Sequence, residues 1–255
     1  MIQGGSDMHD VHQSYNMLLV VLSYVVAVLG SFTALQLAVA IPVARTASQR
    51  WGAVLAAGAA VGIGAIWAMH FIAMLACDTG MEVAYDMPLT VLSALLAFAA
   101  CSLGLVVAGT GVFSWPKLVS GGIYMGLGVA GMHYLGMSAM LMPATLDYNG
   151  GLVVASVAIA VVASIAALWL AFNLRGPLQM VGSALVMGVA VCGMHYTGMA
   201  AVDFLPDASR LPAGFEQGMR GDYLGMTIFA VVAVLLVATL SVNFIRQQRR
   251  ADVSI

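Results

Sequence analysis

Residues 192–199 read CGMHYTGM, and two earlier stretches repeat the pattern: residues 130–137 read AGMHYLGM and residues 67–74 read WAMHFIAM. Each copy has the form Met-His-aromatic-x-small-Met. The motif contains three of the five histidines in the chain, spaced 63 and 62 residues apart: His70, His133 and His195. Each copy lies within a long apolar run, so the sequence places three imidazoles inside an apolar protein.

The chain of 255 residues is 62% hydrophobic and only 8% charged. This composition excludes a soluble domain of this size, which could not bury so much apolar surface. Apolar runs of 18 or more residues are typical of transmembrane helices, since only helices and closed barrels satisfy the backbone in lipid. We therefore predict an all-α integral membrane protein with seven transmembrane helices at residues 15–43, 52–76, 87–109, 118–142, 151–174, 178–202 and 223–245.

Basic residues are unevenly distributed between the two ends of the predicted helices. Most follow the first, third, fifth and seventh helices, and only Arg210 and Arg220 fall on the opposite side. Because basic residues near helix ends mark the cytoplasm, we expect the N-terminus outside and the C-terminus inside. The expected organisation is an external tail (1–14), a membrane domain (15–245) and a short cytoplasmic tail (246–255).

The chain contains an internal repeat of roughly 62 residues. Each unit is a pair of helices, and the units begin near Tyr15, Met87 and Gly151, which leaves the seventh helix over. Stacked repeats that share one core are a known architecture. The second helix of each pair carries the motif, so the three motif helices run parallel.

The three histidines are expected at one depth in the bundle. His70 and His195 each stand eight residues before an aspartate of the outer polar edge, which is roughly 12 Å along a helix. His133 precedes Pro143 by ten residues, or roughly 15 Å. We therefore predict that the three imidazoles converge in one site.

Methionines surround each histidine at helical spacing. Residues four apart share a helix face, and the methionines at this spacing are Met74, Met137 and Met199. The flanking methionines are Met69, Met132 and Met194. One further turn outward stand Cys77 and Met140, which together with the outer aspartates Asp78 and Asp203 form a candidate path for ion access.

Imidazole and thioether together form a soft donor set, which favours copper and in particular Cu(I). Zinc more often recruits carboxylate or thiolate. Haem is an alternative, although three matched histidines exceed its two axial positions. The structural alternative is that the methionines fill gaps in the core, but an ionisable group buried in lipid marks function, and a threefold recurrence favours ligands. Tyr134 and Tyr196 are candidates to contact a bound ligand or to pack against a neighbouring helix.

The stretch Met194-His195-Tyr196-Thr197, with its near-copy at residues 132–135, resembles the motif of the MHYT family of bacterial integral membrane sensor domains. The resemblance covers essentially the whole chain. It implies seven helices in the inner membrane, copper bound by the Met and His residues, and sensing of oxygen, carbon monoxide or nitric oxide. The first copy departs from the pattern, because Phe71 replaces the tyrosine. Many members of the family carry cytoplasmic cyclic-di-GMP domains. This chain has none, so we expect a separate signalling partner.

Three functions are open on the sequence. The first is a copper-dependent sensor of a diatomic gas or of redox state. The second is a copper storage, chaperone or transport protein, and the third is an electron-transfer protein linked to haem or quinone. No buried acid–base pair accompanies the histidines, so we expect a binding protein and not an enzyme. The expected partners are the bilayer, the ion or gas, and a signalling protein, with no nucleic acid.

Overall fold

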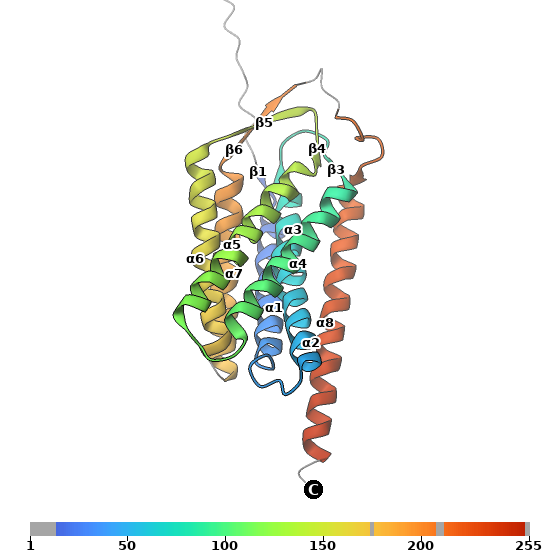
Figure 1. The fold of residues 1–255 in the computed structure, drawn as a ribbon. Helices are drawn as coiled ribbons and strands as arrows, with labels where there is room; N and C mark the ends of the chain where they lie inside the picture. The colour runs from blue at the N-terminus through green and yellow to red at the C-terminus, as the bar shows by residue number, and fades with distance from the viewer. Residues whose placement is uncertain (1–13, 174–175, 208–211, 253–255) are drawn as a thin grey trace, which may run out of the picture.

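A computed structural model of the protein describes residues 14–173, 176–207 and 212–252. Over these residues the chain folds into helical rods, which confirms the expected all-helical architecture (Figure 1). The second rod is continuous but contains the π-helix η1, nine residues that end three positions before His70. The helices are α1 (Met17–Ala38), α2 (Ala47–Gly58), η1 (Ala59–Trp67), α3 (Ala68–Ala76), α4 (Met87–Gly109), α5 (Trp115–Ser138), α6 (Gly150–Asn173), α7 (Pro177–Met199) and α8 (Gly221–Asp252).

Five helical segments within the described residues are long and apolar enough to cross a membrane. This supports a multi-pass membrane protein. The glycine-rich α5 and the helix α8 are not among the five, so seven spans stay a prediction. The five segments are Met17–Ala38, Ala47–Ala76, Met87–Gly109, Gly150–Asn173 and Pro177–Met199.

Short antiparallel ladders, all at one end of the bundle, close each repeat on itself (Figure 1). In each case the strand before the first helix of a repeat pairs with the strand after its second helix. Three predicted helix ends were therefore wrong, because Tyr15, Met142 and Val202 lie in or beside these strands. The pairs are β1 (Ser14–Tyr15) with β2 (Cys77–Asp78), β3 (Ala84–Tyr85) with β4 (Met140–Leu141), and β5 (Ala144–Tyr148) with β6 (Val202–Pro206). A further strand, β7 (Met219–Arg220), pairs with β3.

An Asn or Asp begins the first helix of every repeat and does two tasks there. The side chains of Asn16, Asp86 and Asn149 accept hydrogen bonds from amides of the first helical turn, as at Asp86 Oδ1 and the Leu89 amide, 2.8 Å apart. Such caps satisfy amides that the helix leaves unpaired. The backbone amides of the same three residues donate to the carbonyls of Ala76, Ala139 and Ala201, at 2.8–2.9 Å. Each cap thereby ties the start of a repeat to its end.

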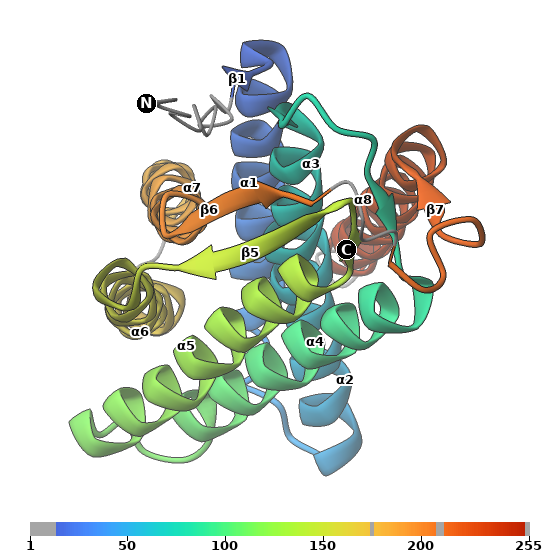
Figure 2. The same cartoon turned by 90° about the horizontal axis from the view of Figure 1, so that it is seen from above.

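Six rods form a closed ring (Figure 2). Going round the ring, α1 packs on α7, α7 on α6, α6 on α5, α5 on α4, and both α4 and α1 on η1. The motif helices α3, α5 and α7 contact one another across the centre, while α8 lies beside the ring and packs mainly on α3 and η1. The helix that carries the motif in each repeat therefore faces the axis of the ring.

Glycines allow the ring to close tightly, as the small-residue spacing at Gly62 and Gly126 predicts. A side-chain carbon at Gly62 would meet the Ala97 carbonyl oxygen of α4 at 2.7 Å, and one at Gly126 would meet Val161 Cα of α6 at 2.5 Å. Both distances are too short for a real contact. Larger residues at these positions would force the helices apart.

Candidate metal centre

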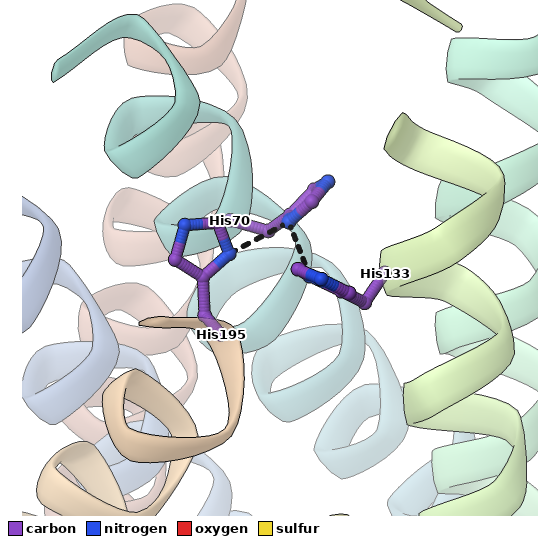
Figure 3. Close-up of side chains that lie close together, drawn as sticks. All are labelled: His70, His133 and His195. Atoms are coloured by element: carbon purple, nitrogen blue, oxygen red, sulfur yellow. Dashed lines mark hydrogen bonds between the residues drawn. The ribbon is translucent and has the colours of Figure 1, made fainter. Parts of the chain in front are cut away.

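The three motif histidines meet at the centre of the ring (Figure 3). His70 lies on α3, His133 on α5 and His195 on α7. Their exposed fractions are 1%, 0% and 0%. His70 Nδ1 lies 3.0 Å from His195 Nδ1 and 3.2 Å from His133 Nδ1. The predicted convergence of the histidines is thus present in the structure, and the converging atoms are the Nδ1 nitrogens.

Two of the three nitrogen separations match those around a single metal ion. Zinc–histidine bonds of about 2.0–2.1 Å in a tetrahedral site separate two ligand nitrogens by about 3.3 Å, close to the 3.0 and 3.2 Å of the two pairs that include His70. One ligand nitrogen from each of the three histidines lies within 4.8 Å of the other two. Hydrogen bonding alone serves the cluster poorly, because His70 Nδ1 faces two other Nδ1 atoms and has one proton or one lone pair to offer. A cation can accept all three lone pairs at once.

The other ring nitrogens point away from the convergence. The Nε2 atoms of His70, His133 and His195 are buried and have no hydrogen-bond partner among the described residues. Two of them press on glycines of the next motif. A side-chain carbon at Gly136 would collide with His70 Nε2, and one at Gly198 would collide with His133 Nε2. Gly136 and Gly198, three positions after His133 and His195, therefore leave room for the histidine ring of the preceding repeat.

Aromatic rings surround the histidines with threefold regularity. Phe71, Tyr134 and Tyr196 each lie edge-on to the histidine before them, with ring centroids 4.8–5.0 Å apart. Each also meets a tyrosine of the ladder strands at 5.8–6.0 Å. These outer tyrosines are Tyr15, Tyr85 and Tyr148, the residues that directly precede the three helix caps.

A serine stands eight residues after each outer tyrosine, and two of these serines bind a residue of a neighbouring motif copy. Ser23, Ser93 and Ser156 are fully buried, and each donates to the carbonyl three residues earlier. Tyr134 forms a 2.6 Å hydrogen bond with Ser156 on α6, and Trp67 Nε1 donates to Ser93 on α4 at 3.1 Å. The hydroxyl of Tyr134 is thus engaged with a neighbouring helix.

The outer tyrosines, caps and serines were not identified from the sequence. The signal was available, because Tyr-Asn, Tyr-Asp and Tyr-Asn open the three repeats and a serine follows each tyrosine at the same interval. These positions fall in regions where the sequence pattern is dominated by apolar residues.

The six candidate methionines are all buried, with exposed fractions of 0–2%. Met69 packs in a small cluster with Ala27 and Ala73, while Met194 lines a cavity of the ring. Whether their sulfur atoms ligate a metal with the histidines stays a prediction. The six are Met69, Met74, Met132, Met137, Met194 and Met199.

The candidate access residues lie in the ladder strands that cover the outer end. Cys77 and Asp78 form β2, Met140 lies in β4, and Asp203 lies in β6 with an exposed side chain. Cys77 is half-buried and forms no disulfide, and burial raises the pKa of its thiol. The Asp78 carboxylate accepts a hydrogen bond from the Gly80 amide at 2.8 Å. Their role as an access path remains a prediction.

Comparison with known proteins gives a consistent result. The MHYT family model, described as "Bacterial signalling protein N terminal repeat", matches residues 64–121, 126–184 and 188–254. The bifunctional diguanylate cyclase/cyclic di-GMP phosphodiesterase MucR of Pseudomonas aeruginosa is 39% identical over 249 residues, 95% of this chain and 36% of that protein. The cyclic di-GMP phosphodiesterase NbdA of the same organism is 36% identical over 196 residues, 74% of this chain and 24% of that protein.

The signaling protein YkoW of Bacillus subtilis is 29% identical over 256 residues, which are 94% of this chain and 31% of that protein. The chain thus spans about a quarter to a third of the length of these three relatives. No solved structure matches it.

Proposed function

This chain belongs to the MHYT family of bacterial signalling proteins, and we propose that it is a copper-dependent sensor of a diatomic gas or of redox state in the bacterial inner membrane. The observation that carries the proposal is the meeting of three buried Nδ1 atoms in the apolar centre of a helical ring. An ionisable group in that position is costly and calls for a functional reason.

The expectation of a sensor and not an enzyme is confirmed by the family. MHYT repeats form the sensor region of signalling proteins, and the enzymatic activities of the relatives lie in other domains. For this chain, the gas or redox state and the route by which the signal leaves are parts of the proposal. We propose a separate membrane or cytoplasmic protein as the receiver.

The donor set supports copper. His70, His133 and His195 would hold the ion through Nδ1, and the adjacent buried methionines offer thioethers, a combination that suits Cu(I). When bound, copper supplies a redox-active ion that can take a small ligand at an open position. Haem is less compatible with this geometry, because nitrogens 3.0 and 3.2 Å apart leave no room for a macrocycle between them.

The protein's own residues prepare the site in three ways. The ring of helices excludes water from the histidines, which are at most 1% exposed. Gly136 and Gly198 leave space for the His70 and His133 rings and so set their orientation. The aromatic residue after each histidine packs edge-on against the imidazole, with ring centroids 4.8–5.0 Å apart, and so restricts its movement.

The proposed topology has seven spans, with α5 and α8 crossing the membrane beside the five strongly apolar segments. An antiparallel ring of six rods requires α5 to run through the same layer as its neighbours α4 and α6. The charge distribution supports an orientation in which the ladder strands lie outside and the end of α8 lies in the cytoplasm. In this topology the metal centre lies nearer the outer surface.

The test is metal analysis of protein purified without chelators, together with its optical spectrum. We expect about one copper per chain, as one convergent donor set predicts, and no haem absorption. His133→Ala should reduce the bound copper at least about tenfold, while His12→Ala, a histidine outside the motif, should leave it unchanged. Zinc, haem or no cofactor in the wild-type protein would refute the copper centre.

A further inference from the structure

A small cavity lies on the axis of the ring, directly beneath the three histidines. Ile66, Val129 and Val191 line it, and each stands four residues before a motif histidine. Residues four apart share a helix face and are separated by about 6 Å along the axis. The cavity is therefore one helical turn from the metal centre, on the side opposite the ladder strands.

The cavity suits a small apolar molecule and does not suit water. Its volume is about 30 Å³, and Ser164 offers the one hydroxyl in an otherwise apolar wall. A buried water requires about 10–15 Å³ and two to four polar partners. The space is sufficient here, but one hydroxyl cannot replace those partners. Apolar cavities of this kind stay dry and take up apolar guests such as xenon.

A second cavity of about 20 Å³ continues the first away from the histidines. The two share wall residues on the four helices η1, α5, α6 and α7, among them Met125 and Met187, each eight residues before a motif histidine. The second extends to Ala38 at the end of α1 and to Ala171 near the end of α6. Together they form an apolar column that follows the axis of the ring and ends beneath the metal centre.

We propose that the first cavity, beneath the histidines, is a binding site for an apolar gas molecule, separate from the metal centre and adjacent to it. An uncharged diatomic gas dissolves in the bilayer and can occupy a dry cavity without losing hydrogen bonds. Held there, it lies one helical turn from the three Nδ1 atoms. The cavity would then act as a gas reservoir for the sensor. This reservoir role rests on the proposed function, whereas the binding of gas to the cavity is independent of it.

Xenon is the probe for this site, because it needs no metal and is detected by its own NMR signal. The wild-type protein in detergent should show a saturable change in xenon chemical shift. Ala160→Val adds two methyl groups to the buried wall of the cavity on α6 and should weaken xenon binding at least tenfold. Ala158→Val, on the exposed face of the same helix, is the matched control and should bind as the wild type does.

Val129→Ala enlarges the cavity and should tighten xenon binding, which gives a second variant if Ala160→Val fails to fold. Absence of saturable xenon binding to the wild-type protein would overturn the proposal, as would equal binding to the Ala160→Val and Ala158→Val variants. The reservoir role is tested on the copper-loaded protein, where Ala160→Val should slow carbon monoxide binding at least tenfold. If the protein purified without chelators binds xenon but contains no copper, the gas site stands and only the proposed function is refuted.

Discussion

Replacing Gly198 with alanine should weaken copper binding, although Gly198 has no side chain to act as a ligand. The new Cβ would collide with His133 Nε2 and would lie 2.9 and 3.0 Å from its Cδ2 and Cε1. Ordinary contact begins near 3.4 Å, so the ring must withdraw by at least about 0.5 Å, the tolerance within which a functional group has to be held. The withdrawal moves His133 Nδ1 relative to His70 Nδ1, now 3.2 Å away.

The expected magnitude follows from this shift. Changes that disturb the orientation of a metal ligand typically reduce metal affinity by about 10–100-fold, and overpacking a tight site costs about 1–3 kcal/mol of stability. Competition between the protein and a Cu(I) chelator under reducing conditions measures the affinity. Thermal unfolding of the metal-free protein measures the stability.

Gly193→Ala is the matched control on the same helix. No atom lies within 4 Å of the Cβ that this change would add, so copper affinity should stay at the wild-type value. Helix propensity favours alanine over glycine by about 1 kcal/mol, so the stability should not fall. Wild-type copper affinity in the Gly198→Ala variant would refute the view that these glycines position the histidines, as would an equal loss in both variants.

The remaining predictions use the same binding and stability assays or label intact cells. Met74→Leu/Met137→Leu conserves volume and should cost less than about 1.5 kcal/mol of stability, while a role as ligands predicts at least a tenfold loss of Cu(I) affinity. Met17→Leu, on the exposed face of α1, is the control, and unchanged affinity in the double variant would leave a histidine-only site. Tyr134→Phe removes a hydrogen bond to α6 and should lower the free energy of unfolding by about 1 kcal/mol with copper affinity unchanged; altered copper affinity would instead connect this hydroxyl to the metal centre. Ser254→Cys should resist an impermeant thiol reagent in intact cells, and its labelling would reverse the proposed orientation.

The sequence was sufficient to predict the all-helical architecture and the meeting of His70, His133 and His195. Helix rise alone sets the depth of a residue, and the shared motif gives the three helices the same orientation. The sequence did not indicate which ring nitrogen faces the centre. For His70 and His133 that choice depends on Gly136 and Gly198, whose role appears only when the neighbouring helix is in place.

The ladder strands were missed for a different reason. Apart from β5 and β6, each strand has only two residues, too few for an alternating pattern to be recognised. Their pairing joins segments about 55 to 65 positions apart in the chain, and such contacts leave no local signature. The predicted helices at residues 118–142 and 178–202 therefore continued into residues that are extended in the structure.

The helix α8 gives the three equal repeats an unequal connection to the rest of the molecule. In a ring of identical units, no histidine would differ from the other two. A movement of the histidines would then be transmitted equally to all three repeats. Here His70 Nδ1 is the atom shared by both short nitrogen contacts. Its helix α3 continues from the π-helix η1 and is the motif helix on which α8 mainly packs. The symmetry of the site is thus broken at the first repeat, whose motif helix packs on α8.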